Sequence, residues 1–316
     1  MYLKLPESIH FELTDLCNAM CPMCDRVDII DGELVESKLV TKSQLSFDKY
    51  YDVFGDRQIK NVNYCGNLGD PLMAKDLMQF VLHFERLGAN QRIHTNGSVR
   101  NKEFWEDLAK IKNFYVVFGI DGIVQEQHEK YRVGTDLNKI FENAKTFIEN
   151  GGIAIWQMLV FDFNEENVND AKKLSKEMGF KQFTTRNTES RFNLVYSTNS
   201  ITYRYNENIN YLRPPSKKYN ASITSKASLL SEMTIDKYKK IKNVSCDAKK
   251  AHEIFIDSKG NIYPCCYIAN SPVFKPDNIK NHKVDDLIYS TKFEELDYSI
   301  KNNPNEICKV VCGDQN

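Results

Sequence analysis

The first 188 residues alternate between short apolar runs and amphipathic helical segments, and this alternation limits the folds open to the chain. The runs are rich in β-branched and aromatic residues, which favour strands. They cover residues 8–13, 61–66, 91–97, 114–121, 153–161 and 181–187. Strands that alternate with helices pair in parallel through right-handed crossovers. Six units are too few for a closed eight-stranded barrel, so we expect an α/β fold with a partial (β/α)6 TIM-like barrel.

The helical segments between these runs cover residues 76–88, 101–111, 137–151 and 167–179, and three of them end at glycine. We expect residues 1–188 to form the partial barrel and residues 241–316 to form a smaller, cysteine-bearing domain. Residues 189–240 are rich in Asn, Ser, Tyr and Lys and contain Pro214 and Pro215, which predicts a connector. Its tyrosines either cover the barrel or line a substrate entrance.

The composition excludes several classes of partner. The chain has 316 residues, and its 42 basic and 43 acidic residues give a formal net charge of -1, which predicts neither nucleic acid nor an anionic membrane as a partner. No stretch approaches the roughly 20 apolar residues of a membrane span. The chain has nine cysteines, an odd number, which favours metal ligation over a set of disulfides. Metal-ligating thiols fit a reducing compartment, so we expect a cytoplasmic protein.

Cys17, Cys21 and Cys24 form a C-x3-C-x2-C stretch directly after the first predicted strand. The carboxyl end of a parallel strand is the edge where ligands bind in such folds. Closely spaced thiolates suit an iron–sulfur cube that is reached from one side. Three protein ligands leave one iron open to a small molecule, whereas a structural zinc needs a fourth donor, for which the neighbouring Asp25 is an unusual choice.

This stretch resembles the signature of the radical S-adenosylmethionine (radical SAM) superfamily. The resemblance implies a 4Fe–4S cluster whose open iron chelates the amino and carboxylate groups of S-adenosylmethionine (SAM). It also implies reductive cleavage of SAM to a 5′-deoxyadenosyl radical that abstracts a hydrogen atom from a substrate. Met23 stands where the family often has an aromatic residue against the adenine, and a flexible thioether can cover the same surface.

The segment CGNLGDPL, residues 65–72, resembles the glycine-rich element of the family that ends in Gly-Glu-Pro. It implies a cofactor contact by four residues, namely Gly66, Asn67, Gly69 and Asp70. Asp70 replaces the usual glutamate and reaches one methylene less far. A tight turn between strand and helix is the alternative explanation of the two glycines.

Three later strand ends also resemble family elements that face the cofactor. Thr95 and Asn96 belong to a Thr-Asn-Gly turn, and Asp121 belongs to an Ile-Asp-Gly turn. The resemblance places Arg132 near the methionine carboxylate as a charge-assisted partner, and Asn164 beside the cofactor. Strand-end caps or turns explain each element taken alone.

The C-terminal cysteines resemble those of the SPASM and twitch auxiliary-cluster domains, through the spacing C-x13-G-x4-C from Cys246 to Cys265. Five cysteines complete only one further 4Fe–4S cluster, so the resemblance implies a twitch domain with the ligands Cys246, Cys265, Cys308 and Cys312. Cys266 points away from Cys265 if the segment is extended, and is either a core residue or an alternative ligand. A structural zinc in the four-cysteine site stays open.

The resemblance implies that the substrate radical is oxidised, with the auxiliary cluster as electron acceptor. We expect a carbohydrate-like alcohol or a peptide as substrate and a flavodoxin or ferredoxin as reductase. The absence of a leader-binding module before Phe11 favours a substrate other than a leader-guided ribosomal peptide. Cys65 and Tyr64 are candidate proton carriers or else packed core residues. Redox-neutral epimerisation or carbon–sulfur bond formation is an alternative, and an iron–sulfur electron carrier is the non-enzyme alternative.

Overall fold

The computed structural model describes residues 6–192, 198–216, 240–269, 271–281 and 291–313. The chain divides into two compact units, each built from segments that are distant in the sequence. Unit 1 contains Met1–Leu16, Thr41–Arg92 and Ile235–Asn316, and unit 2 contains Cys17–Val40 and Ile93–Thr234. The predicted domain ranges follow the sequence instead, and they stay a prediction.

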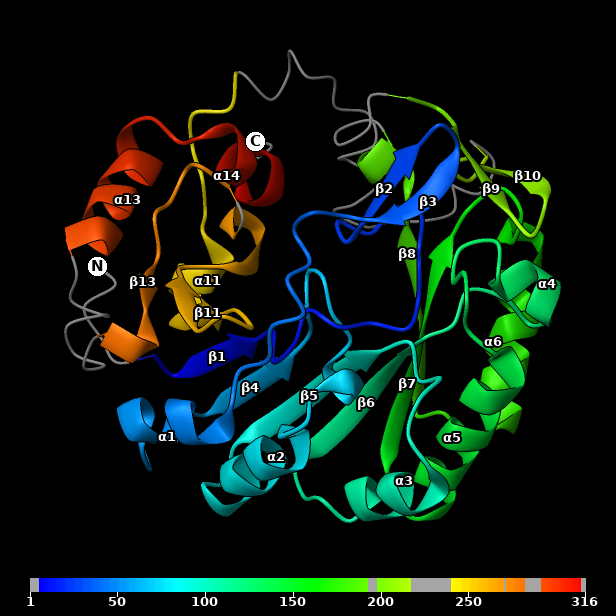
Figure 1. Ribbon diagram of the computed structural model, residues 1–316, viewed down its shortest axis with the longest axis horizontal. Helices are drawn as coiled ribbons and strands as arrows, with labels where there is room; N and C mark the ends of the chain where they lie inside the picture. Colours follow the sequence, from blue (N-terminus) through cyan, green and yellow to red (C-terminus); the bar gives the residue numbers. More distant parts are fainter. Residues whose placement is uncertain (1–5, 193–197, 217–239, 270, 282–290, 314–316) are drawn as a thin grey trace. The chain divides into compact units, whose positions relative to one another are not determined.

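Unit 1 is built around a sheet in which β1 is central. The strands are β1 (Ser8–Phe11), β4 (Asn61–Tyr64), β11 (Glu253–Ile256), β12 (Asn261–Tyr263) and β13 (Asp277–Asn278), in the order β13-β12-β11-β1-β4. β1 pairs in parallel with both β4 and β11, whereas β12 pairs antiparallel with β11 and β13. The C-terminal segment therefore extends the same sheet as the first strand (Figure 1).

One face of β1 and β4 packs into an aromatic core. Phe11 lies within 5.3–5.9 Å, between ring centroids, of four aromatic rings, namely Tyr50, Tyr64, Phe80 and Phe84. These rings come from β4, α1 (Phe47–Phe54) and α2 (Leu77–Arg86). Side chains alternate along a strand, so His10 lies on the opposite face of β1.

The rest of unit 1 consists of short helices. They are η1 (Pro71–Met73), α11 (Asp247–Lys250), η4 (Cys266–Ile268), η5 (Ile279–Asn281), α13 (Thr291–Asn302) and α14 (Glu306–Cys312). α14 begins at an Asn305 cap whose side chain accepts from Cys308 N. This cap sets the position of the first cysteine of the helix.

Unit 2 contains the next strands of the alternating pattern. β5 (Asn90–Thr95) begins in unit 1 and ends in unit 2, where β6 (Phe114–Gly119), β7 (Ile153–Val160) and β8 (Gln182–Asn187) follow. β7 pairs in parallel with both β6 and β8. The pattern predicted all six strands from β1 to β8 in the alternating series, and the structure confirms each of them.

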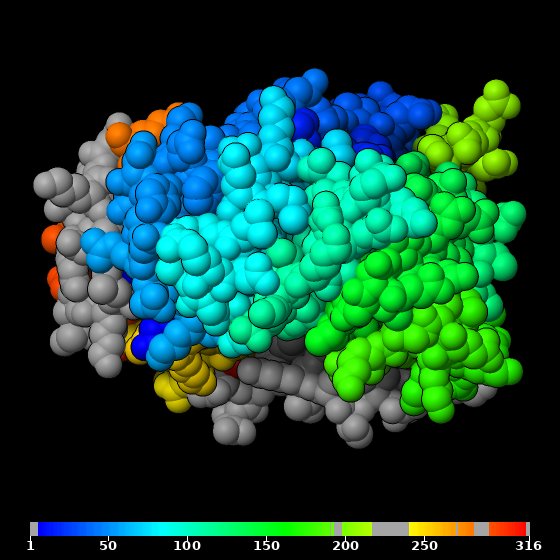
Figure 2. Space-filling model, turned by 90° about the horizontal axis from the view of Figure 1, so that it is seen from below, coloured from blue at the N-terminus to red at the C-terminus, as the bar shows by residue number. Residues whose placement is uncertain are grey.

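Three amphipathic helices, α3 (Lys102–Ala109), α5 (Leu137–Glu149) and α6 (Val168–Glu177), lie on one side of these strands (Figure 1). Their buried side chains meet an aromatic cluster that contains Trp105, Phe118, Phe147, Trp156 and Phe180. Seen from this side, the green residues of unit 2 form a closed surface (Figure 2). Shorter helices of unit 2 are α4 (Gln125–His128), η2 (Glu165–Asn167) and α7 (Glu189–Arg191).

A second sheet of unit 2 lies partly in the segment that we expected to be a connector. Its strands are β2 (Val27–Ile30), β3 (Glu33–Glu36), β9 (Ile201–Tyr205) and β10 (Asn208–Leu212), in the order β10-β9-β3-β2. Tyr203 of β9 is buried, which agrees with a covering role for this tyrosine, whereas Tyr211 of β10 is half exposed. Residues 193–197 and 217–239 of the predicted connector lie outside the described residues. None of the helices that the structure describes is long and apolar enough to cross a membrane.

Candidate functional site

The C-x3-C-x2-C stretch opens unit 2 as a compact loop. Cys24 N donates to Cys21 O at 3.0 Å, and Ala19 N donates to Cys17 Sγ at 3.4 Å. Burial raises the pKa of the Cys21 thiol to about 12 and also raises that of Cys24. The raised pKa favours the protonated thiol. A bound metal reverses this preference, because a coordinating thiol is deprotonated by the charge of the ion. Three thiols in one loop are therefore a suitable donor set for a cluster.

Apolar side chains cover this loop. Met23 is 1% exposed and belongs to a cluster with Tyr131, Phe161 and Tyr203, into which Cys21 also packs. Tyr203 comes from the hairpin β9–β10, which the sequence pattern did not predict. The cover buries Cys21, whereas Cys17 and Cys24 stay partly exposed, so a metal centre on this loop would be reached from one side.

The turn after β5 contacts the cysteine loop through Asn96. Its Nδ2 donates to Asn18 Oδ1 at 3.0 Å and lies 3.7 Å from Cys17 Sγ. Its Oδ1 accepts from Ser98 N at 2.9 Å and from Ser98 Oγ at 2.6 Å. Thr95 Oγ1 accepts from Gly97 N, so its hydroxyl shapes the turn. The predicted Thr-Asn pair thus lies beside the first cysteine.

Asp121 and Arg132 form a buried ion pair next to the same loop. Arg132 Nε donates to Asp121 Oδ2 at 2.6 Å, and the other carboxylate oxygen accepts from Leu159 N at 2.6 Å. Burial raises the pKa of Asp121 even with the guanidinium beside it. Burial by itself lowers the pKa of Arg132, but the charges of Asp121 and Cys21 outweigh this effect and raise it. Arg132 therefore stays charged close to Cys21.

Two further buried side chains hold this ion pair in place. Asn164 Nδ2 donates to Asp121 O and Leu159 O, both at 2.9 Å, and its Oδ1 accepts from Phe161 N at 2.8 Å. These bonds tie the ends of two strands together, and the role of Asn164 beside the cofactor stays a prediction. His128, which the sequence pattern did not single out, accepts from Asp121 N at 3.2 Å. Burial lowers the pKa of His128 to about 3, so its ring is neutral.

The glycine-rich loop after β4 belongs to unit 1. A Cβ at Gly69 would lie 1.8 Å from Thr14 O, and one at Gly66 would lie 2.4 Å from Gly69 O. Glycine is therefore required by the packing of the loop against the segment that leads to Cys17. Asp70 accepts from Leu72 N at 3.0 Å and caps η1, and its own N–H donates to Leu16 O at 2.8 Å.

Glu12 supports the glycine-rich loop, a function that the sequence pattern did not show. Its Oε1 accepts from Leu68 N at 2.6 Å and from Gly69 N at 3.4 Å. Burial raises the pKa of Glu12 to about 7. Asn67 Nδ2 donates to Cys266 O at 2.9 Å, which joins this loop to the C-terminal segment of unit 1.

The four predicted auxiliary ligands lie near one another in unit 1. Burial, together with the nearby thiols of Cys246 and Cys308, raises the pKa of Cys265 to about 12. The pKa of Cys308 is raised to about 11 by burial, with further effects from Cys246 and Cys312. Cys265 has an extended backbone, with φ -160° and ψ 163°, which turns the next side chain to the other side. Cys266 accordingly interacts with Cys65 and Glu253 as well as with Cys265.

We call the polar side chains of His10, Asn63, Arg92, Glu253 and Cys266 the polar wall of unit 1. His10 and Asn63 are partners in the register of β1 and β4, and Arg92 Nε donates to Asn63 Oδ1 at 3.1 Å. Arg92 lowers the pKa of Glu253, although burial raises it overall. These side chains come from five different elements, which is why the sequence pattern did not bring them together.

The two candidate proton carriers at the end of β4 differ in their surroundings. Tyr64 is fully buried in the aromatic core, and its hydroxyl donates to Gln91 Oε1 at 2.8 Å. Cys65 is half-buried beside the polar wall, and its carbonyl oxygen lies 2.6 Å from His10 Nε2. The packed-core alternative therefore describes the position of Tyr64, whereas Cys65 is partly exposed.

A single metal ion needs a different arrangement of ligands from that of an iron–sulfur cluster. Across the described ranges, no three or more His, Cys, Asp or Glu side chains are arranged to hold one ion. Cysteines around an iron–sulfur cube bind different corners, so they lie further apart than the four ligands of one zinc.

Comparison with known families shows which kind of metal centre these cysteines belong to. A model described as the radical SAM superfamily matches residues 11–177, which is more than half of the chain. The chain belongs to the radical SAM superfamily. A second model, the SPASM iron–sulfur cluster-binding domain, matches residues 246–313.

Solved structures of radical SAM enzymes share the fold. The structure of Streptococcus suis SuiB bound to S-adenosylmethionine has a TM-score of 0.64 at 14% identity, and the match covers 97% of this chain and 72% of SuiB. Native anSMEcpe with bound AdoMet and Cp18Cys peptide has a TM-score of 0.59 at 17% identity, with 96% and 87% of the two chains covered. The predicted α/β fold, a partial (β/α)6 barrel followed by an auxiliary iron–sulfur region, is confirmed.

One curated relative also matches part of the chain. The tungsten-containing aldehyde ferredoxin oxidoreductase cofactor-modifying protein of Pyrococcus furiosus is 24% identical over 124 residues. This match covers 38% of this chain and about a third of the relative (32%). Membership in the superfamily confirms the predicted cofactors, a 4Fe–4S cluster with SAM, and the SPASM match confirms an auxiliary iron–sulfur cluster.

Proposed function

We propose that this radical SAM enzyme oxidises its substrate by two electrons, and that the auxiliary cluster accepts one of them. The observation that carries the proposal is the group of four thiols formed by Cys246, Cys265, Cys308 and Cys312. A cluster held by four thiolates has no open iron, which suits electron transfer better than substrate binding. Zinc in the same four-thiol site would remove this electron acceptor.

The proposed ligands of the SAM-binding cluster are Cys17, Cys21 and Cys24. Bound there, the cluster and SAM supply the 5′-deoxyadenosyl radical. The side chain of Arg132 is 19% exposed, and its charge suits the carboxylate of the methionine moiety. The backbone of the glycine-rich loop, from Gly66 to Asp70, suits the methionine ammonium. Met23 covers the cysteine loop and provides an apolar surface for the adenine.

His10 is the proposed proton acceptor of the oxidation. Burial lowers its pKa to about 4, so the ring is neutral at pH 7. Its Nε2 lies 2.6 Å from Cys65 O, an acceptor, so Nε2 carries the proton. Nδ1 then has a lone pair and no hydrogen bond to a described residue. A substrate that loses an electron from an α-hydroxy carbon radical becomes a protonated carbonyl, which is acidic enough to transfer its proton to a weak base.

A peptide is the preferred substrate class. Support comes from the two neighbours that were solved with peptides, one with the Cp18Cys peptide and one, SuiB, with the precursor peptide SuiA. The donors and acceptors of the polar wall suit amide and hydroxyl groups, and they also suit a carbohydrate-like alcohol. We further propose a cytoplasmic enzyme that a flavodoxin or ferredoxin reduces. All nine cysteines lie in the described part of the chain without forming disulfides, which supports a reducing compartment.

The test uses reconstituted enzyme, dithionite, SAM and candidate peptides with deuterated serine, threonine or cysteine side chains. We expect one deuterium to appear in 5′-deoxyadenosine, together with a peptide product that is 3 Da lighter than the deuterated substrate, because it has lost that deuterium and one proton. His10→Gln keeps the size of the side chain and should slow product formation while label transfer continues. Label transfer without any oxidised product, from peptides and from carbohydrate alcohols, would contradict the proposal.

A redox-neutral reaction is the second candidate, and the position of Cys266 favours it. Its thiol belongs to the polar wall and interacts with Cys65 and Glu253 as well as with Cys265. A thiol can return a hydrogen atom to a carbon radical, which would leave the oxidation state of the substrate unchanged. Reactions in D2O distinguish the two candidates, because a thiol-quenched product gains one deuterium at carbon and an oxidised product does not. Cys266→Ser should abolish this incorporation if the second candidate is correct.

A further inference from the structure

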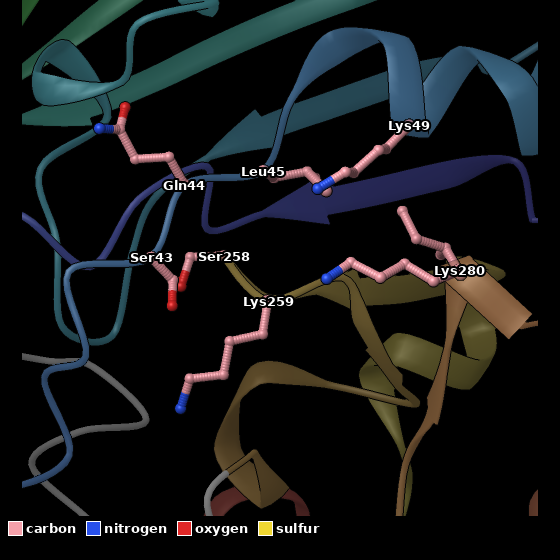
Figure 3. Close-up of a pocket in the computed structure, with 8 residues that line it drawn as sticks. Ser43, Gln44, Leu45, Lys49, Ser258, Lys259 and Lys280 are labelled. Atoms are coloured by element: carbon pink, nitrogen blue, oxygen red, sulfur yellow. The ribbon is translucent and has the colours of Figure 1, made fainter.

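Unit 1 contains a pocket that is separate from the cysteine sites. Its volume is about 210 Å3, which is several times the volume of about 30 Å3 that one water molecule takes up in the liquid. It lies between the segment before α1, the turn that joins β11 to β12, and η5 (Figure 3). The residues that line it are Ser43, Gln44, Leu45, Lys49, Ser258, Lys259, Ile279 and Lys280.

The lining residues carry three positive charges and no negative one. Lys49, Lys259 and Lys280 come from three different segments, and none of them forms an ion pair with a residue that the structure describes. Figure 3 shows the side chains of Lys49 and Lys280 extending in the same direction, one above the other, whereas the side chain of Lys259 extends away from both. Three like charges around one space repel one another unless an anion lies between them.

The carboxylate of Asp257 belongs to the same turn as Lys259 and interacts with its charge, but its hydrogen bonds go to other groups. Asp257 is 6% exposed, and its two oxygens accept from Lys259 N, Asn261 N and Asn261 Nδ2 at 2.8–2.9 Å. Its carboxylate is therefore used to shape the turn between β11 and β12. This turn between β11 and β12 holds Ser258 and Lys259 at the pocket.

Ser258 supplies a second and independent observation. The residue is 4% exposed, yet its hydroxyl forms no hydrogen bond with any residue in the described ranges. The hydroxyl keeps some contact with solvent and lies at the surface of the pocket, so a ligand or an ordered water there can accept its hydrogen bond. Ser43 lies beside it in the lining, and its hydroxyl is 2.7 Å from Thr41 Oγ1.

The pocket is also connected to the carboxyl end of β1. Ser43 O accepts from Thr14 Oγ1 at 3.1 Å and from Asp15 N at 3.2 Å, two residues that follow β1 directly. Ser258 likewise lies just after the end of β11, which is parallel to β1. The carboxyl ends of parallel strands are the edge at which ligands bind.

We propose that this pocket binds an oxyanion, namely phosphate or the phosphate group of a small phosphorylated molecule. The ammonium groups of Lys49 and Lys280 neutralise its charge, with Lys259 adding to the positive potential, and the hydroxyl of Ser258 donates to one of its oxygens. Charge-assisted hydrogen bonds of this kind are about twice as strong as neutral ones. The site is distinct from the residues that we propose to bind SAM.

The experiment is isothermal titration calorimetry of the reconstituted enzyme with inorganic phosphate and with pyrophosphate, at constant ionic strength. We expect saturable binding of one ion per chain. Lys49→Gln combined with Lys280→Gln should weaken it about ten-fold or more. The matched control combines Lys102→Gln with Lys145→Gln, which removes two charges from exposed helix positions and should change the affinity less than about two-fold.

Ser258→Ala tests the hydroxyl and should weaken binding about ten-fold with unchanged circular dichroism. If this variant does not fold, Lys280→Gln alone, at an exposed position, takes its place. An equal loss in the matched control, or no saturable binding below about 10 mM, would overturn the proposal. Formation of 5′-deoxyadenosine is measured in the same preparations. Its persistence in the variants separates a failure of this site from a failure of the proposed function.

Discussion

Removal of the Arg132 guanidinium tests the buried ion pair beside the cysteine loop. Arg132→Gln leaves the carboxylate of Asp121, which has no exposed surface, with the N–H of Leu159 as its remaining donor among the contacts described above. At the 2.6 Å separation of Nε and Oδ2, the attraction is about 6 kcal/mol for an effective dielectric constant of about 20. The cost of desolvation offsets much of it. Breaking a buried pair from one side costs about 3–5 kcal/mol, and the partial exposure of Arg132 favours the lower end.

The assay is urea unfolding of the cluster-free protein at pH 7, followed by circular dichroism. We expect Arg132→Gln to lower the free energy of unfolding by about 3 kcal/mol. The double variant with Asp121→Asn has no buried charge, so it should recover about 2 kcal/mol of that loss. Its affinity for SAM should stay low, because the proposed carboxylate partner is still missing. A loss below about 1 kcal/mol in the single variant, or no recovery in the double one, would refute the reasoning.

Three further predictions concern Glu12, Gly69 and Cys265. Glu12 has a pKa of about 7 in the folded chain against 4.5 in the unfolded chain, so the folded state binds the extra proton. The free energy of unfolding should therefore fall by about 3 kcal/mol as the pH rises from 4.5 to above 7, and Glu12→Gln should flatten this dependence in pH-dependent urea melts. Gly69→Ala should cost more than about 3 kcal/mol because its Cβ has no space, whereas Gly88→Ala, at φ +75° in open space, should cost about 1–2 kcal/mol; thermal unfolding compares the two. Cys265→Ser should remove about four irons per chain in a colorimetric iron assay and Cys266→Ser none, and equal losses would contradict the proposed ligand set.

The six strands could be predicted because each is apolar, short and bounded by turn residues. The outer face of these strands is buried under helices, so local composition is enough to mark them. The position of β11 beside β1 could not be predicted in this way, because it depends on pairing between residues about 245 positions apart, such as Ser8 and Glu253. The hairpin β9–β10 was missed because Asn, Tyr and Arg alternate with its few apolar residues. Only Ile201, Tyr203 and Leu212 are buried there.

Some residues of the candidate site could be predicted from the sequence, and others could not. The cysteine spacing indicated a cluster loop, and the turn after β5 indeed lies beside it through Asn96. Glu12, His10 and Arg92 were not predicted, because single polar residues inside apolar strands carry no local signal. Their importance comes from the register of neighbouring strands. The direction of Cys266 could be inferred from strand alternation because Cys265 is extended.

The central claim is tested most directly by the formation of 5′-deoxyadenosine from SAM. The anaerobically reconstituted protein, with roughly eight irons per chain, is reduced with dithionite, and the nucleoside is measured by mass spectrometry. We predict its formation by the wild type and none by Cys24→Ala. A fully reconstituted wild type that leaves SAM intact would contradict the assignment of Cys17, Cys21 and Cys24 to a catalytic cluster.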